Sequence, residues 1–216
     1  MCGRYTLTKK QLRFASRFST EELQIFLKER YNIAPTQTVP LIHIVGGKLV
    51  TEEIRWGLQP VWSKAPIINA QCEGILNKPT FRQSVLQRRC LMPADGFYEW
   101  QGKTPFHFTF PGREPFYFGG IVDTWTTPDK SPIQCCSIIT TAANEVVSPF
   151  HKRMPFILAP ADYDIWLDPA TKPEQLETLF KRPHAVALQA TASKPLVPDG
   201  APRPPHKPTQ SEFLLT

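Results

Sequence analysis

The chain has 216 residues, of which 41% are hydrophobic and 20% are charged. A chain of this size and balance buries a core without disulfide or metal staples, and no apolar run approaches the roughly 20 residues that span a membrane. The net charge of +6 and sequence pI of about 9.1 are compatible with an anionic partner such as nucleic acid, although such a charge also serves solubility alone.

Two helices are expected near the N-terminus, after a few strand-like residues. The first covers Lys9 to Phe18, and the second covers Thr20 to Arg30. The capping-box pattern Ser19-Thr20-Glu21-Glu22 opens the second helix, whose apolar residues recur on one face. Both helices are expected to cover a sheet.

A β-hairpin is expected next, from Leu41 to Val45 and from Lys48 to Trp56. Gly46-Gly47 between the two segments supplies the positive φ angles that a tight hairpin turn requires.

Short aromatic or β-branched segments bounded by Pro, Gly or Asp dominate the rest of the chain, which is typical of antiparallel sheets. Strands are expected at Arg89 to Met92, Phe97 to Trp100, Phe106 to Phe110, Phe116 to Thr124, Cys135 to Thr141, Phe156 to Leu158 and His184 to Ala190. Helices are expected at Pro160 to Leu167 and Pro173 to Phe180, each opened by Pro.

The pattern predicts an α+β fold in a single domain. Its antiparallel β sheets form a barrel-like or sandwich core with flanking helices. The domain is expected to cover residues 1–193, followed by an extended Pro-rich tail over residues 194–216.

The five cysteines are an odd set without a CxxC pair or a zinc-like His spacing, at positions 2, 72, 90, 135 and 136. We expect neither disulfides nor a metal, and hence a reducing, cytoplasmic location. The sequence contains no P-loop, no GxGxxG after a strand and no HExxH, so no cofactor is expected.

Cys2 is the most informative residue, because Met1 is normally removed before so small a residue. Mature Cys2 then carries an amine and a thiol on adjacent carbons. An aldehyde condenses with the amine to an imine, and the thiol closes a five-membered thiazolidine ring on the same carbon. The alternative is an ordinary frayed terminus.

Three residues are candidates to serve Cys2 in acid-base chemistry. Glu99 lies in a strand among aromatic residues, where burial would raise the pKa of its carboxyl, unless it points to solvent. His151 lies in a loop beside Lys152 and Arg153, which disfavour its cationic form. Asn69 interrupts an apolar run, so its amide either orients a reacting group or ties a turn together.

Basic side chains alternate with aromatic ones, as suits single-stranded nucleic acid, where cations follow phosphates and rings stack on bases. The basic residues are Arg4, Arg55, Lys64, Lys78, Arg82, Arg88, Arg89, Lys152 and Arg153. The aromatic residues are Trp56, Trp62 and Phe81, of which Trp56 and Phe81 are also candidates for the core.

Seven motifs occur in one order: Met1-Cys2-Gly3-Arg4-Tyr5, Tyr31-Asn32-Ile33-Ala34-Pro35-Thr36, Trp56-Gly57-Leu58, Ile68-Asn69-Ala70, Cys90-Leu91-Met92-Pro93-Ala94-Asp95-Gly96-Phe97-Tyr98-Glu99-Trp100, Ile139-Thr140-Thr141-Ala142 and His151-Lys152-Arg153-Met154-Pro155. Together they resemble the SOS response-associated peptidase (SRAP) family.

The resemblance implies a sensor of abasic sites in single-stranded DNA. Cys2 would form a thiazolidine crosslink that protects the site from strand cleavage, with an associated autoproteolytic or peptidase activity. It implies that His151 opens the sugar ring, Glu99 manages protons on the amine and imine, and Asn69 holds the amine or the sugar.

The resemblance also implies a DNA channel lined by Arg4, Asn32, Pro35, Trp62, Thr140 and Arg153. The chain departs from the family pattern at Gln71 and Pro79, where relatives often have Arg. Each missing phosphate contact lowers the salt dependence of binding, and Lys78 and Arg82 are the expected substitutes.

Two alternatives stay open. One is a cysteine peptidase with Cys2 as nucleophile and His151 as base. The other is a noncatalytic domain that binds single-stranded nucleic acid. A monomer is expected in each case.

Overall fold

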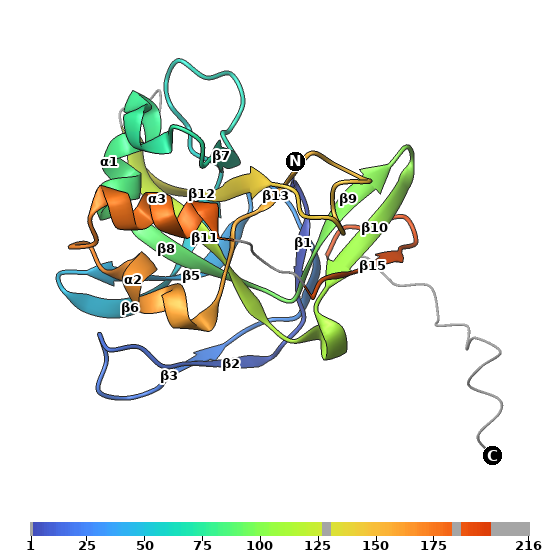
Figure 1. Cartoon of the computed structure of the whole chain (residues 1–216), viewed down its shortest axis with the longest axis horizontal. Helices are drawn as coiled ribbons and strands as arrows, with labels where there is room; N and C mark the ends of the chain where they lie inside the picture. The colour runs from blue at the N-terminus through green and yellow to red at the C-terminus, as the bar shows by residue number, and fades with distance from the viewer. Residues whose placement is uncertain (1, 127–130, 183–186, 200–216) are drawn as a thin grey trace.

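The computed structural model describes residues 2–126, 131–182 and 187–199 (Figure 1). Its centre is a closed ring of five strands. They are β5 (Thr38–Val45), β6 (Lys48–Trp56), β8 (Arg89–Ala94), β11 (Phe116–Thr126) and β12 (Pro132–Ala142). The pairing runs β12-β6-β5-β8-β11 and returns from β11 to β12, and only the β12–β6 contact in this ring is parallel. Closure removes the free edges of the ring, and the predicted mainly antiparallel α+β domain is confirmed.

The expected hairpin is confirmed as β5 and β6, in which Val45 pairs with Lys48. Gly46 and Gly47 form the turn with φ angles of 56° and 78°, the left-handed region required at both central positions of a two-residue primed turn.

Short elements flank the ring. β7 (Asn69–Gln71) and β13 (Arg153–Pro155) pair with β12, and β14 (Ile157–Leu158) pairs with β11. The helices are α1 (Pro79–Gln87), α2 (Tyr163–Leu167) and α3 (Pro173–Lys181), with 3-10 turns η1 (Ile75–Asn77), η2 (Pro111–Arg113) and η3 (Pro160–Asp162). Within the described residues, no helix combines the length and apolar character needed to cross a membrane.

A second sheet has the order β15-β10-β9-β1-β4 and packs against the ring. Its strands are β1 (Tyr5–Leu7), β4 (Arg30–Ile33), β9 (Gly96–Gln101), β10 (Thr104–Thr109) and β15 (Gln189–Ala192). The Tyr5 ring lies 5.5 Å from the Trp56 ring and 5.6 Å from the Phe118 ring, measured between centroids. These contacts join the start of the chain to strands β6 and β11 of the ring. Figure 1 shows the N-terminus close to β13, with β7 on one side and β9 on the other.

The two expected N-terminal helices are wrong. Residues in this region form a two-stranded sheet of β2 (Gln11–Phe14) and β3 (Leu23–Phe26). Leu12 and Phe14 alternate with exposed neighbours, a period of two that favours a strand. The Phe14 ring packs 5.4 Å from the Tyr117 ring, a contact distant in sequence that overrides local helix propensity.

Other predictions agree with the structure to different degrees. The predicted helix from Pro173 is confirmed as α3, whereas Pro160 to Leu167 divides into η3 and α2. The last strand, β15, ends later than expected; residues 184–186 of the predicted segment lie outside the described residues. Helix α1 was not predicted, although Pro79 at its first position is a recognisable start signal.

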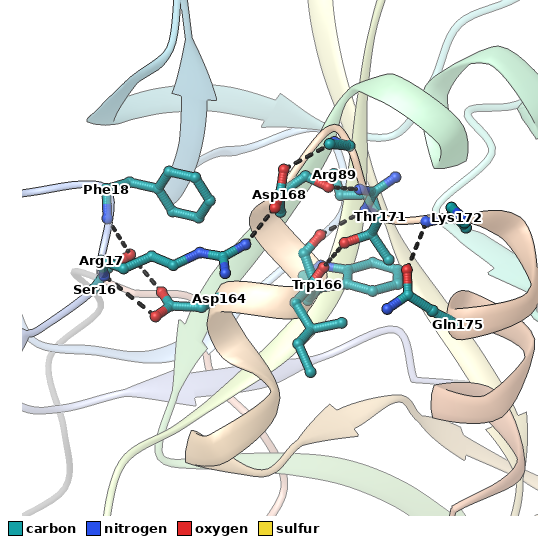
Figure 2. A network of polar contacts seen from close by, with 12 residues as sticks. Ser16, Arg17, Phe18, Arg89, Asp164, Trp166, Asp168, Thr171, Lys172 and Gln175 are labelled. Carbon is teal, nitrogen blue, oxygen red and sulfur yellow. Dashed lines mark hydrogen bonds and ion pairs between the residues drawn. The ribbon is translucent and has the colours of Figure 1, made fainter.

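Arg89 is only 3% exposed, so its expected role among the residues facing an anion is wrong. Its guanidinium donates to the carbonyls of Val85 and Leu86, at 2.6 and 2.7 Å, at the end of α1. It also donates to the carbonyls of Trp166, at 2.5 Å, and Asp168, at the end of α2 (Figure 2). One buried cation therefore satisfies the last carbonyls of two helices.

Arg89→Met is expected to lower the free energy of unfolding by roughly 3–5 kcal/mol, because it leaves buried carbonyls without donors. Urea unfolding monitored by circular dichroism measures this loss. Arg13→Met is the matched control, since Arg13 pairs with Glu22 at the surface and its loss is expected to remain within about 1 kcal/mol. Equal losses in the two variants would contradict the assigned role of Arg89.

Candidate active site

The start of the chain is held between two strands. The Asn69 side chain, at the start of β7, donates from Nδ2 to the Cys2 carbonyl at 3.0 Å. The Arg4 carbonyl accepts the Tyr98 amide of β9 at 2.9 Å and lies 3.9 Å from the Cys2 sulfur. Cys2 is fully buried, whereas Met1 lies outside the described residues. The segment from Cys2 to Arg4 is therefore held by β7 on one side and by β9 on the other.

The buried Asp95 carboxylate anchors the following residues of β1. It accepts from the Thr6 hydroxyl at 2.6 Å and from the Thr8 amide at 2.7 Å. Since the Thr6 hydroxyl donates to Asp95, it accepts from His107 Nε2, 3.1 Å away. Burial lowers the pKa of His107 to about 4, so this imidazole is neutral near pH 7. This network holds β1 against the turn between β8 and β9.

Glu99 points to the interior and is 4% exposed, on the same face of β9 as the buried Phe97. It pairs across the sheet with Phe106, whose ring lies 4.5 Å from the Phe150 ring. Burial raises the pKa of the Glu99 carboxyl, and this effect outweighs the lowering caused by nearby positive charge. The solvent-facing alternative for Glu99 is wrong.

The Cys2 thiol is also buried. Burial raises the pKa of the thiol far above its usual range, and the negative charge of Glu99 raises it further. The sulfur is therefore a neutral thiol near pH 7, so its attack on an electrophile requires removal of a proton.

His151 lies in the loop that joins β12 to β13, next to Phe150. The backbone amide of Arg153 donates to its Nδ1 at 2.9 Å. The same Nδ1 lies 3.2 Å from the Arg153 carbonyl, which would accept a proton held on Nδ1, so the two contacts are compatible with either tautomer. The backbone of Arg153 thus orients the imidazole through Nδ1.

Arg153 is held at the same end of the sheet. Its guanidinium donates to Glu73 at 2.6 Å and to the Thr140 carbonyl at 2.5 Å, with the Thr140 hydroxyl 3.4 Å away. Thr140 is fully buried, so it contacts Arg153 rather than solvent. The hydrogen bond from Arg153 is the main reason that the pKa of Glu73 is lowered. Sequence analysis missed Glu73, because only the fold brings it to Arg153.

The other predicted DNA-binding residues spread outward from this site. Arg4 Nη1 donates to Asn32 Oδ1 at 3.1 Å, and Asn32 itself is buried. Pro35 is half-buried. Trp62, in the loop between β6 and β7, is 65% exposed. Lys78 and Arg82 lie at the start of α1, where Lys78 is half-buried and Arg82 is exposed.

Chemically, the structure brings together a thiol, a buried carboxyl and an imidazole, with an amide that fixes the thiol-bearing residue. All five cysteines are buried thiols. Among the described residues, no three His, Cys, Asp or Glu side chains are grouped so as to hold a metal ion. The arrangement suits proton transfer around a nucleophile at residue 2.

The sequence model of the family described as SOS response associated peptidase (SRAP) matches residues 1–198. The chain belongs to the SRAP family. It is 35% identical over 213 residues to the abasic site processing protein YoqW of Bacillus subtilis (strain 168), which covers 91% of this chain and 94% of that SRAP protein. It is 30% identical over 194 residues to the abasic site processing protein HMCES of Gallus gallus, covering 71% of this chain and 58% of that protein.

A solved structure of a Bordetella bronchiseptica protein matches the SRAP fold described above. The TM-score is 0.71, and the match covers 89% of this chain and 100% of that chain. The two sequences are 21% identical, so this likeness concerns the fold alone. The family inferred from the motifs is confirmed.

Proposed function

We propose that this SRAP protein processes abasic sites, the activity for which its relatives YoqW and HMCES are named. We propose further that it captures the site in single-stranded DNA as a thiazolidine on Cys2. The observation that carries the proposal is the fixed position of Cys2, with its carbonyl bound by Asn69 and its thiol in the electrostatic field of the buried Glu99.

The reaction requires a chain in which Met1 has been removed, so that Cys2 carries a free α-amine. The amine attacks the aldehyde of the ring-opened abasic sugar, and loss of one water gives an imine. The thiol then adds to the imine carbon, forming a C–S bond while its proton ends on the nitrogen. The product mass is therefore the sum of protein and DNA less one water.

The neighbouring side chains have distinct roles in this proposal. Glu99 accepts the proton that the attacking amine releases and returns one to the departing hydroxyl, which suits a carboxyl whose pKa is raised. His151 assists opening of the sugar ring through Nε2. Asn69 orients the amine indirectly, through the Cys2 carbonyl.

The DNA strand is proposed to reach Cys2 over a surface of cations and one exposed indole. Trp62 offers a stacking face for a base. Arg4 and Arg153 contact phosphates near Cys2, with Asn32 and Thr140 holding them in place. Pro35, Lys78 and Arg82 complete the predicted surface.

Intact mass spectrometry tests the proposed function directly. Purified protein is incubated with a single-stranded oligonucleotide containing one abasic site. The matched control is the same oligonucleotide with the abasic aldehyde reduced to an alcohol. We expect a heat-stable product at the summed mass of protein and DNA less one water. It should form with the aldehyde-containing oligonucleotide and not with the reduced control. No adduct from protein shown to begin at Cys2 would refute the proposed chemistry.

The peptidase activity in the family description remains a second proposal. In a peptidase the Cys2 thiol, which burial keeps protonated, must make the first attack, whereas in aldehyde capture the α-amine attacks first and the thiol only closes the ring afterwards. We therefore place aldehyde capture first, with any peptide cleavage confined to the protein's own N-terminus or to reversal of the crosslink. A noncatalytic binding domain would form no adduct in the same experiment.

A further inference from the structure

Strand β4 lies at an edge of the second sheet, and its pairing with β1 shifts register. Tyr5 pairs with Ile33 and Leu7 pairs with Arg30, so Thr6 alone faces both Tyr31 and Asn32. Two residues against one is the arrangement of a β-bulge, which leaves backbone groups without partners in the ladder.

A carboxylate from the far end of the chain fills this gap. Asp199 Oδ1 accepts from the amides of Tyr31 and Asn32, at 2.8 and 3.0 Å. Its Oδ2 lies 3.5 Å from Arg30 Nε. A single carboxylate therefore satisfies both amides of the bulge, and its charge is balanced by Arg30.

The bulge also positions Asn32. Both the nitrogen and the oxygen of the Asn32 side-chain amide form hydrogen bonds. Asn32 Nδ2 donates to the Val197 carbonyl at 2.7 Å, and Oδ1 accepts from Arg4 Nη1 at 3.1 Å. Since Asn32 is 4% exposed, it acts by holding Arg4 rather than by touching DNA. A chain of contacts thus connects Asp199 and Val197 to Arg4.

Arg4 borders a surface pocket of about 270 Å³, whose lining also includes Trp100, Lys103, Pro195 and Leu196. The C-terminal segment Lys194–Asp199 is therefore both the support of Asn32 and part of the wall beside Arg4. Among the described residues, those that line this pocket include two cations, Arg4 and Lys103, and no acidic side chain, which suits a phosphate.

We infer that Asp199 is a positioning residue for DNA binding, acting through Asn32 on Arg4. The inference rests on the proposed function, since it assigns Arg4 to a DNA phosphate. It makes the segment Lys194–Asp199 part of the DNA-binding surface.

Asp199→Ala and Asp199→Asn form a matched pair for the test. The amide oxygen of asparagine can still accept from both Tyr31 and Asn32, whereas alanine accepts from neither. Binding of a fluorescent single-stranded oligonucleotide is measured by anisotropy over a series of salt concentrations. We expect Asp199→Ala to weaken binding roughly 5- to 10-fold and to reduce the salt slope by about 0.7, the value for one phosphate contact on a single strand. Asp199→Asn should bind nearly as the unmodified protein does.

A double variant and a rate measurement distinguish a role through Arg4 from a merely structural role of Asp199. If Asp199 acts through Arg4, adding Asp199→Ala to Arg4→Ala causes no further loss of affinity, because the two changes are not additive. At saturating abasic oligonucleotide, the crosslinking rate of Asp199→Ala should match that of the unmodified protein. Full additivity with Arg4→Ala, an unchanged salt slope, or equal losses for both Asp199 variants would overturn the inference.

Asn32→Leu provides a second route if Asp199→Ala does not fold. It interrupts the same chain at its middle, leaves the bonds of Asp199 to the backbone intact, and is expected to reduce the salt slope by the same amount. An unchanged slope overturns the inference. DNA binding without an adduct would refute only the proposed chemistry, whereas the absence of DNA binding would refute both proposals.

Discussion

Cys2→Ala is expected to eliminate the heat-stable adduct with abasic DNA, the largest effect of any substitution considered for this protein. The α-amine remains after removal of Met1, so the variant can still form an imine. Without the thiol no C–S bond forms, and the imine hydrolyses on heating. Intact mass spectrometry after heating should show the adduct for the unmodified protein and none for the variant.

Borohydride provides the decisive control for this variant. Reduction of the imine to an amine should trap a Cys2→Ala adduct that is absent without borohydride. That result would separate loss of ring closure from loss of DNA binding or of the fold. A heat-stable adduct of Cys2→Ala without reduction would contradict the role of the thiol.

Glu99→Gln is expected to slow crosslinking roughly 100- to 10,000-fold, the usual contribution of a general acid-base group. Burial raises the pKa of Glu99, so the carboxylate is lost as the pH falls through that raised value. The rate for the unmodified protein should therefore decline on the acidic side. Protonation of the α-amine slows both proteins as the pH falls. Single-turnover rates over a pH series should therefore show, for the unmodified protein, an additional decline that Glu99→Gln lacks.

The same substitution is expected to change stability in the opposite direction. The folded-state pKa of Glu99 lies above its unfolded value, so the stability from the protonated carboxyl is present below the unfolded pKa and lost as the pH rises through the folded pKa. Above that range the buried carboxylate destabilises the fold, which the neutral amide of Glu99→Gln avoids. Thermal unfolding at about pH 8 should show a variant at least as stable as the unmodified protein. If Glu99→Gln crosslinks more slowly and is also less stable than the unmodified protein, the loss of rate would reflect a damaged fold and not the loss of a general base.

Local sequence signals predict those parts of the fold that depend on neighbouring residues. Gly46-Gly47 predicts the turn between β5 and β6, because its φ angles are a local property. Proline predicts the start of α3 for the same reason. The first 30 residues show the limit of such signals. Phe14 packs against Tyr117, and this distant contact favours strand over helix.

The residues of the candidate site also differ in whether local sequence signals are enough to predict their role. Cys2 carries an amine and a thiol in its own atoms, so the sequence alone is enough to propose it as the nucleophile and, through the order of motifs, to identify the SRAP family. Alternation along β9 places Glu99 and Tyr98 on opposite faces but does not show that both side chains are buried, since only tertiary packing decides that.

Contacts between residues that are distant in sequence could be identified only from the tertiary structure. Glu73 meets Arg153 across 80 residues, and Asp199 meets Asn32 across 167 residues. The sequence by itself determined the hairpin and the family and was enough to propose Cys2 as the nucleophile, because these depend on residue chemistry and local backbone geometry. Only the tertiary structure determined the burial of Glu99, the support of Arg4 by Asn32 and Asp199, and the interior position of Arg89, because burial and hydrogen-bond partners arise from segments that meet only when the chain folds.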